Sequence, residues 1–119
     1  MSDPIVVDVS DLAPGQLRRI DAGERRLLVC NAEGTFYALE DRCPHAAVPL
    51  SGGVLRGCLL ECPLHGGSVD VRDGSPAALP IRRPATTYPV RTLDGGSEIE
   101  IAIESESDAG IEIGIEPGV

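Results

Sequence analysis

Two short segments of the chain carry the side chains best suited to chemistry, Cys43-Pro44-His45 and Cys62-Pro63-Leu64-His65. Each segment supplies one thiol and one imidazole, and both histidines of the protein lie in these segments. Two sulfur and two nitrogen ligands suit either a tetrahedral zinc ion or a [2Fe–2S] cluster in which two histidines replace two cysteines on one iron. The sequence therefore predicts a metal centre with Cys43, His45, Cys62 and His65 as its ligands.

The spacing of the four residues favours the cluster over zinc. Structural zinc modules usually place two cysteines in one turn and two histidines in another. Here each segment carries one residue of each kind, which allows each loop to reach both irons of a mixed-ligand cluster. A zinc-bound interaction module remains open as the less favoured alternative.

The residues around the two segments resemble the cluster-binding segment of Rieske-type ferredoxins, in the run CPHAAVPLSGGVLRGCLLECPLHGGSVDVRDGSPAALP from Cys43 to Pro80. The flanking sequence resembles the same family, in particular the ferredoxin components of aromatic-ring-hydroxylating dioxygenases, so the resemblance covers about residues 5 to 103. Its most specific part is the C-x-H…C-x-x-H pair, followed by Gly66 and Asp70. The resemblance implies one [2Fe–2S] cluster, with Cys43 and Cys62 on one iron and His45 and His65 on the other.

The chain reads as an all-β protein of one domain. It has 119 residues, with 14 glycines and 10 prolines for many turns, and no segment has a helical period. The resemblance implies the Rieske fold, an antiparallel β-sandwich with an inserted small cluster-binding subdomain. We expect this domain over residues 1–104, its subdomain over about 43–80, and an acidic C-terminal tail over 105–119.

Strands are expected where apolar and β-branched residues run between turn signals. In Glu98–Ile103 the residues alternate, which predicts that Ile99, Ile101 and Ile103 face one side. The turn between the third and fourth strands is expected at residues 31–34. The expected strands are Ile5–Val9, Gln16–Asp21, Arg26–Cys30, Thr35–Glu40, Leu59–Cys62, Ser68–Val71, Thr87–Thr92 and Glu98–Ile103.

Composition excludes several classes of protein. A net charge of −9 disfavours nucleic acid, whose phosphates would repel the chain. No apolar run is long enough to span a membrane, and the N-terminus lacks the basic and apolar regions of a signal peptide, so a cytoplasmic location is expected. Cys30 and Cys58 lie in strand-like apolar runs and are expected to be buried small hydrophobic residues rather than a disulfide.

The surroundings of the predicted cluster indicate a low redox potential. High-potential relatives, by the resemblance, have a bracing disulfide where this chain has Val48 and Leu64. They also have a Ser and a Tyr, which donate hydrogen bonds to sulfur, where this chain has Gly67 and Val69. Donors to sulfur stabilise the reduced state, so their absence lowers the potential.

These observations predict an electron-transfer component rather than an enzyme. A catalytic oxygenase subunit needs two further histidines for a mononuclear iron, and none is left. The resemblance implies a soluble, monomeric one-electron carrier between a flavin-dependent NAD(P)H ferredoxin reductase and a terminal Rieske oxygenase in aromatic-ring dihydroxylation. The partners are expected to dock on an uncharged cap formed by residues 46–50 and 63–67, around His45 and His65. The alternative is the small subunit of an assimilatory NAD(P)H nitrite reductase.

Overall fold

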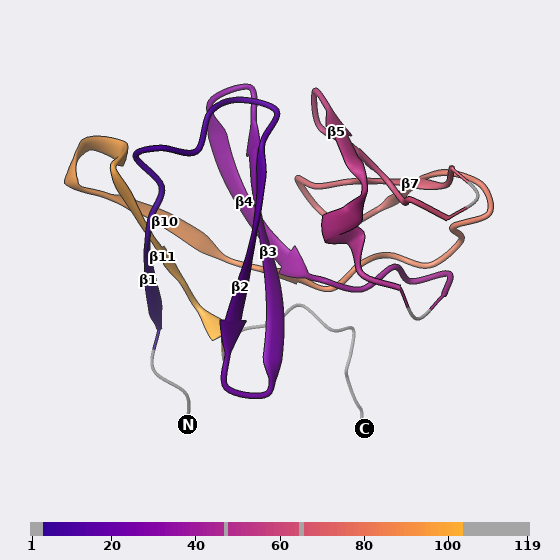
Figure 1. Ribbon diagram of the computed structural model, residues 1–119, viewed down its shortest axis with the longest axis horizontal. Helices are drawn as coiled ribbons and strands as arrows, with labels where there is room; N and C mark the ends of the chain where they lie inside the picture. Colours follow the sequence, from indigo (N-terminus) through magenta and orange to yellow (C-terminus); the bar gives the residue numbers. More distant parts are fainter. Residues whose placement is uncertain (1–3, 47, 65, 104–119) are drawn as a thin grey trace.

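The computed structural model describes residues 4–46, 48–64 and 66–103 (Figure 1). Within these ranges the regular structure consists of β-strands and two single 3₁₀ turns, so the prediction of an all-β protein is confirmed. The elements are β1 Ile5–Asp8, β2 Leu17–Ala22, β3 Arg25–Ala32, β4 Thr35–Glu40, η1 Leu50–Gly52, β5 Val54–Arg56, β6 Leu59–Glu61, β7 Ser68–Asp70, β8 Pro76–Ala78, β9 Thr87–Tyr88, β10 Val90–Leu93, η2 Asp94–Gly96 and β11 Glu98–Ile101.

The strands of the described residues form three antiparallel sheets, with the orders β1-β11-β10, β2-β3-β4-β9 and β5-β6-β7-β8. The first two sheets are built from the ends of the chain, and we call them the base. The third sheet is built from the middle of the chain and lies to one side of the base (Figure 1). With the loops that lead into it, this sheet forms an inserted unit, which we call the subdomain.

Strand β3 lies at the centre of the molecule because both of its faces are covered. Leu27 and Val29 point into a core shared with the first sheet, which we call the base core. Leu28 and Cys30 point into a second core shared with the subdomain, which we call the subdomain core. A strand buried on both faces is apolar at successive positions, which explains the run Leu-Leu-Val-Cys.

Strand β11 confirms the alternation expected at the end of the sequence. Ile99, Ile101 and Ile103 are all buried in the base core, and β11 pairs with β1 on one side and β10 on the other. The intervening Glu100 and Ala102 are only partly buried. The last strand therefore closes the base in the way that its period of two predicts.

Other sequence predictions were wrong in detail. The single strand expected over residues 87–92 is divided at Pro89, so that β9 pairs with β4 and β10 pairs with β11 in a different sheet. Proline has no N–H to donate to a sheet, which suits the switch point. The turn expected at residues 31–34 is shorter, because β3 continues to Ala32 and only Glu33 and Gly34 form the turn, both with positive φ. Strands β5 and β8 were not expected at all.

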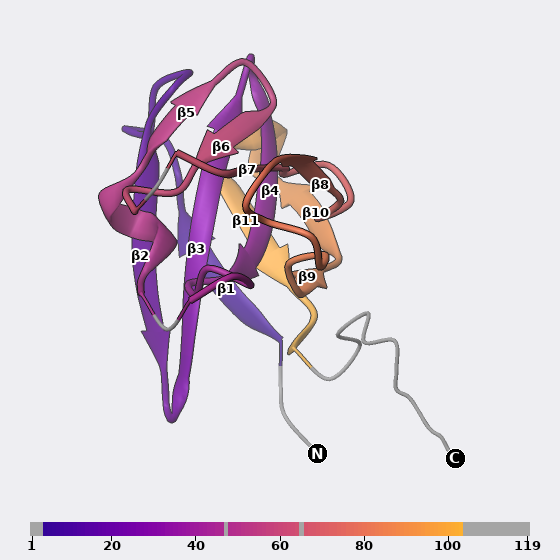
Figure 2. The same ribbon diagram turned by 90° about the vertical axis from the view of Figure 1, so that its right-hand side faces the viewer.

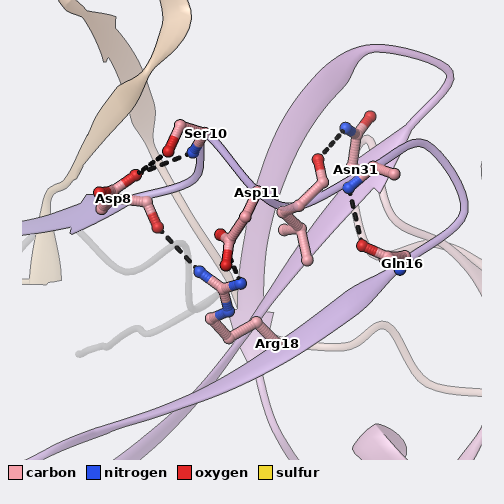
Figure 3. Close-up of polar contacts among 8 residues, drawn as sticks. Asp8, Ser10, Asp11, Gln16, Arg18 and Asn31 are labelled. Carbon is pink, nitrogen blue, oxygen red and sulfur yellow. Dashed lines mark hydrogen bonds and ion pairs between the residues drawn. The ribbon is translucent and has the colours of Figure 1, made fainter.

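Polar contacts close the loop between β1 and β2 over the base (Figure 3). The Arg18 guanidinium donates to the Asp8 carbonyl oxygen at 2.8 Å and pairs with the Asp11 carboxylate at 2.7 Å. The buried Asn31 amide donates to the Leu12 carbonyl oxygen at 2.7 Å. These bonds satisfy the backbone of a loop that has no strand partner, and so fix the edge of the base.

The two cysteines outside the predicted ligand set differ in exposure. All four cysteines are free thiols; Cys30 is fully buried in the subdomain core, as expected, whereas Cys58 is only half-buried at its edge. Burial raises the pKa of the Cys30 thiol to about 12, with the Asp41 carboxylate adding to the effect. Within the described ranges there is no helix long and apolar enough to cross a membrane. The predicted tail, residues 105–119, lies outside the described residues.

Candidate metal centre

Three loops meet at the end of the subdomain, the end that faces the viewer in Figure 2. We call residues 41–49, between β4 and η1, the first loop and residues 62–67, between β6 and β7, the second loop. The third loop, residues 79–86, connects β8 to β9 and so returns the chain from the subdomain to the base. Each of the first two loops contains one of the predicted ligand segments.

The two predicted thiolate ligands lie together in the interior. Cys43 and Cys62 are 1% and 2% exposed, and both belong to the subdomain core. Burial raises the pKa of the Cys62 thiol, the adjacent Cys43 thiol raises it further, and a hydrogen bond from the Leu64 N–H to the sulfur opposes the rise. The two loops, whose cysteines are 19 residues apart in sequence, thus place both thiols in one core, close enough for Cys43 to influence the pKa of Cys62.

Backbone hydrogen bonds hold each loop in a tight turn around its cysteine. The Cys43 N–H donates to the Val48 carbonyl oxygen at 2.8 Å, which closes the first loop. The Cys62 N–H donates to the Gly67 carbonyl oxygen at 2.6 Å, which closes the second. The sulfur positions are therefore fixed by the backbone rather than by side-chain packing alone.

The predicted imidazole ligand of the first loop lies beside its cysteine. His45 is half-buried, and its Nδ1 is 4.0 Å from the Cys43 sulfur. The other predicted imidazole, His65, lies outside the described residues. Within the described residues no group of three or more Cys, His, Asp and Glu side chains is gathered closely enough to hold a metal ion. The four-ligand set therefore stays a prediction.

The described donors fit the sulfur side of a [2Fe–2S] cluster. Two buried free thiols in one core are poorly solvated as thiolates, and an iron ion would supply the compensating positive charge. The Leu64 N–H, 3.5 Å from the Cys62 sulfur, is a donor of the kind that stabilises a metal-bound thiolate. His45, which is only partly buried, lies beside the Cys43 member of this pair.

Asp41 fixes the first loop to the base, a role that the sequence did not reveal. Its buried carboxylate accepts hydrogen bonds from the Ser51 N–H at 2.7 Å and from the Ser51 hydroxyl at 2.8 Å. The Arg19 guanidinium lies 3.8 Å from the same carboxylate. Asp41 stands two residues before Cys43 in the sequence, but nothing in the pattern pointed to a partner ten residues away.

Gly67, which the sequence marks only as a position without a donor to sulfur, has a packing role. A Cβ at this position would lie 2.8 Å from Cγ1 of Ile81 and 3.0 Å from Cδ of Pro80, both in the third loop. Glycine is therefore required for the third loop to pack directly against the second. A backbone amide approaches sulfur in the same loop at Leu64, whose N–H donates to the Cys62 sulfur. Val69, the other position without a donor, is fully buried in β7.

Comparison with known proteins identifies the family. The Rieske [2Fe-2S] domain matches residues 3–89 of this chain. The chain belongs to the Rieske [2Fe–2S] family. The prediction of one Rieske-type [2Fe–2S] cluster is thereby confirmed, and the zinc alternative is set aside.

Curated and solved Rieske proteins extend the match. The ferredoxin component of biphenyl 2,3-dioxygenase from Rhodococcus jostii (strain RHA1) is 44% identical over 85 residues, which are 71% of this chain and 78% of the relative. The solved ferredoxin of carbazole 1,9a-dioxygenase from Nocardioides aromaticivorans IC177 has a TM-score of 0.77 at 36% identity, covering 85% of this chain and 98% of that one. A solved complex of reduced oxygenase and oxidized ferredoxin in carbazole 1,9a-dioxygenase matches with a TM-score of 0.76 at 36% identity, covering 84% of this chain and 94% of that chain.

These matches decide two further predictions. The inserted antiparallel subdomain on a β-sandwich base is the Rieske fold, as expected. The relatives are ferredoxin components of dioxygenase systems, and the prediction of an electron-transfer component rather than an enzyme agrees with them.

Proposed function

We propose that this Rieske protein is a one-electron carrier that passes electrons from a flavin-dependent NAD(P)H reductase to a terminal Rieske oxygenase in aromatic-ring dihydroxylation. When bound, a Rieske [2Fe–2S] cluster accepts and releases a single electron. We assign the ligands to Cys43, His45, Cys62 and His65. The protein acts as a monomer in the cytoplasm.

The single observation that carries the proposal is the contrast between the buried sulfurs and the half-exposed His45 beside them. An electron carrier needs its redox centre shielded from water but close to the surface at one point, so that a partner can approach it. The first loop meets this need because Cys43 is buried, whereas His45, two residues later, is partly exposed to solvent.

The relatives favour the dioxygenase role over the nitrite reductase role. The biphenyl relative is named a ferredoxin component of a dioxygenase, and the solved carbazole complex contains an oxygenase together with its ferredoxin. A carrier with this ligand set and this similarity is best matched to an oxygenase as its electron acceptor.

Reconstitution tests the proposal. The purified holoprotein is combined with a flavin reductase and a terminal oxygenase encoded by neighbouring genes, and oxidation of NADH and formation of a cis-dihydrodiol are followed with an aromatic substrate. We expect product only when all three proteins are present. Electron delivery to nitrite reduction in place of the oxygenase would reject the dioxygenase role in favour of the other one.

A matched pair of variants tests the ligand assignment within the same assay. Cys62→Ser should lose the visible absorption of the cluster and all turnover, whereas Cys58→Ser, at a half-buried cysteine outside the ligand set, should keep both. A Cys62→Ser protein that retains two irons and two sulfides would contradict the assignment.

A further inference from the structure

The third loop carries features that the predicted cap did not include. Leu79, with 68% of its surface exposed, has the highest exposure among the large apolar side chains of the described residues. Arg82 and Arg83 follow it, both exposed, and within the described residues neither forms an ion pair. Four other arginines, at positions 18, 19, 72 and 91, are paired with carboxylates.

This loop borders the two ligand loops directly. Ala78 of β8 pairs with Ser68 of β7, and Ile81 packs where a Cβ of Gly67 would lie. At its other end, Thr86 accepts a hydrogen bond from the Glu40 N–H at 2.8 Å, next to the start of the first loop. Residues 79–83 therefore stand beside the Cys62 loop, at the face of the molecule seen in Figure 2.

A third unpaired arginine borders the same face from the first loop. Arg42 precedes Cys43, is exposed, and forms no ion pair within the described residues. A groove of about 560 Å³ is lined by Arg42 and Val48 on one side and Thr86 on the other, so the first and third loops share a surface. The groove is lined by three arginines and three acidic residues, so the charges of its lining side chains sum to zero. We call Arg42, Arg82 and Arg83 the arginine rim.

The segment of sequence that carries the predicted ligands is opposite in sign of net charge to the whole chain. Residues 42–86 contain five arginines and three acids, a net charge of +2, whereas the entire chain carries −9. Asp70, one of those three acids, is itself paired with Arg72 at 2.6 Å. Since exposed charges act over about 10 Å at 0.1 M salt, a partner at the third loop meets Arg82 and Arg83 at short range, whereas Arg42 shares its groove with three acids.

Resting on the proposed function, we propose that the arginine rim and Leu79 form a docking surface for the terminal oxygenase, which presents acidic side chains around an apolar recess. Leu79 fills the recess, and the rim pairs with the acids. Charge complementarity of this kind sets the rate of encounter and the orientation, while a buried apolar contact supplies affinity. The third loop thus selects the partner, and the ligand loops deliver the electron.

Small redox probes test the local charge without any protein partner. The reduced holoprotein is mixed with ferricyanide, an anion that takes one electron and becomes ferrocyanide, and separately with tris(phenanthroline)cobalt(III), a cation that becomes cobalt(II). We expect the ferricyanide rate to fall as salt rises and the cobalt rate to increase. The opposite salt dependence would show that the probes respond to the net charge of −9, and would overturn the proposal.

Charge reversals locate the effect on the third loop. The double variant Arg82→Glu with Arg83→Glu should slow two reactions at low salt by about tenfold, the oxidation of the reduced holoprotein by ferricyanide and the reduction of the oxygenase by the holoprotein. The cluster spectrum should be unchanged. Arg56→Glu is the control for Arg82→Glu and for Arg83→Glu taken singly. Arg56 is also exposed and unpaired within the described residues, but it lies at the β5–β6 turn, where Gly57 faces Glu33. An equal loss in Arg56→Glu and Arg83→Glu would reject the third loop as the site.

The apolar part of the surface has its own test. Leu79→Ser should slow reduction of the oxygenase severalfold but leave the ferricyanide rate unchanged, while Val6→Ser, at an exposed position on β1, should change neither. If the third-loop variants slow only electron uptake from the reductase, the surface belongs to that partner and the oxygenase assignment is wrong. If the wild-type protein reduces no oxygenase, the proposed function fails even where the ferricyanide result stands.

Discussion

The base and the subdomain are built from the same kind of structure but are stabilised differently. The base has the longer strands, with eight residues in β3 and six in each of β2 and β4. Its core consists of aliphatic side chains and Tyr88, and contains none of the predicted ligands. Burial of apolar surface in long paired strands therefore accounts for the order of the base without any cofactor.

The subdomain has much less regular structure to hold it together. Its four strands have three residues each, and the outer one, β8, is exposed at every position. Its core includes Cys43 and Cys62, the two predicted sulfur ligands. A sheet of such short strands is marginal unless it packs against another element, here the face of β3 that carries Leu28 and Cys30.

One sheet thus takes part in two cores of different kinds. Strand β3 contributes Leu27 and Val29 to a core that contains none of the predicted ligands, and Leu28 and Cys30 to a core that includes the two predicted ligand thiols. Order in the subdomain should therefore depend on metal binding, whereas order in the base should not.

Removal of the cluster is expected to have the largest effect on the difference between the two regions. The subdomain should lose its protection from amide exchange, and the base should keep it. Cys62→Ser, or iron chelation of the wild type, should leave amide exchange in β3, β4 and β11 slow. Exchange in β5–β7 should become faster by about a hundredfold or more, because these amides exchange when the subdomain opens locally and metal loss makes that opening easier. Hydrogen–deuterium exchange with mass spectrometry measures both regions in one sample.

The control for this experiment is Cys58→Ser, which removes a half-buried thiol from the edge of the same core. It should keep the protection pattern of the wild type. Equal loss of protection in base and subdomain after chelation would mean that the two regions form one cooperative unit.

Adjacent residues on β3 provide a sharper test of intermediate size. Leu27→Ala and Leu28→Ala each delete a fully buried leucine and should each cost about 2–5 kcal/mol. Leu27→Ala should lower the midpoint of global unfolding, followed by circular dichroism in urea. Leu28→Ala should instead mainly speed loss of the visible cluster absorption, because its side chain supports the subdomain. Identical behaviour of the two variants would contradict the division into two cores.

The smallest expected effect concerns a surface carboxylate of the base. Hydrogen bonds from the Ser10 hydroxyl at 2.7 Å and the Ser10 N–H at 2.9 Å lower the pKa of Asp8. A lowered pKa stabilises the fold above the ordinary value of about 3.9, and this stabilisation is lost as the pH falls through the lowered value. Carbon-13 NMR titration should give a midpoint below the ordinary one, and Ser10→Ala should raise it. Because Asp8 lies in the base, the midpoint should be the same with and without iron.

Much of the base and the presence of the cluster could be predicted from local sequence. Alternation in Glu98–Ile103 was enough to place the three isoleucines in the core, since a strand has a period of two. The pairing of one Cys with one His in each segment was enough to predict the cluster, since ligand type follows the chemistry of the metal. These features depend on neighbours within a few residues.

Other features were decided by contacts between distant segments. Pro89 ends one strand and starts another in a different sheet, which depends on where β4 and β11 lie. Gly67 must be glycine because Pro80 and Ile81 pack on it, and Asp41 is buried because Ser51 reaches it. The same holds for the arginine rim, whose members stand forty residues apart in sequence and lie on neighbouring loops because the third loop returns beside the first. Local sequence was therefore enough to predict candidate metal ligands and the buried faces of the strands. The tertiary structure alone decided which distant groups meet, because a packed contact depends on the positions of both partners.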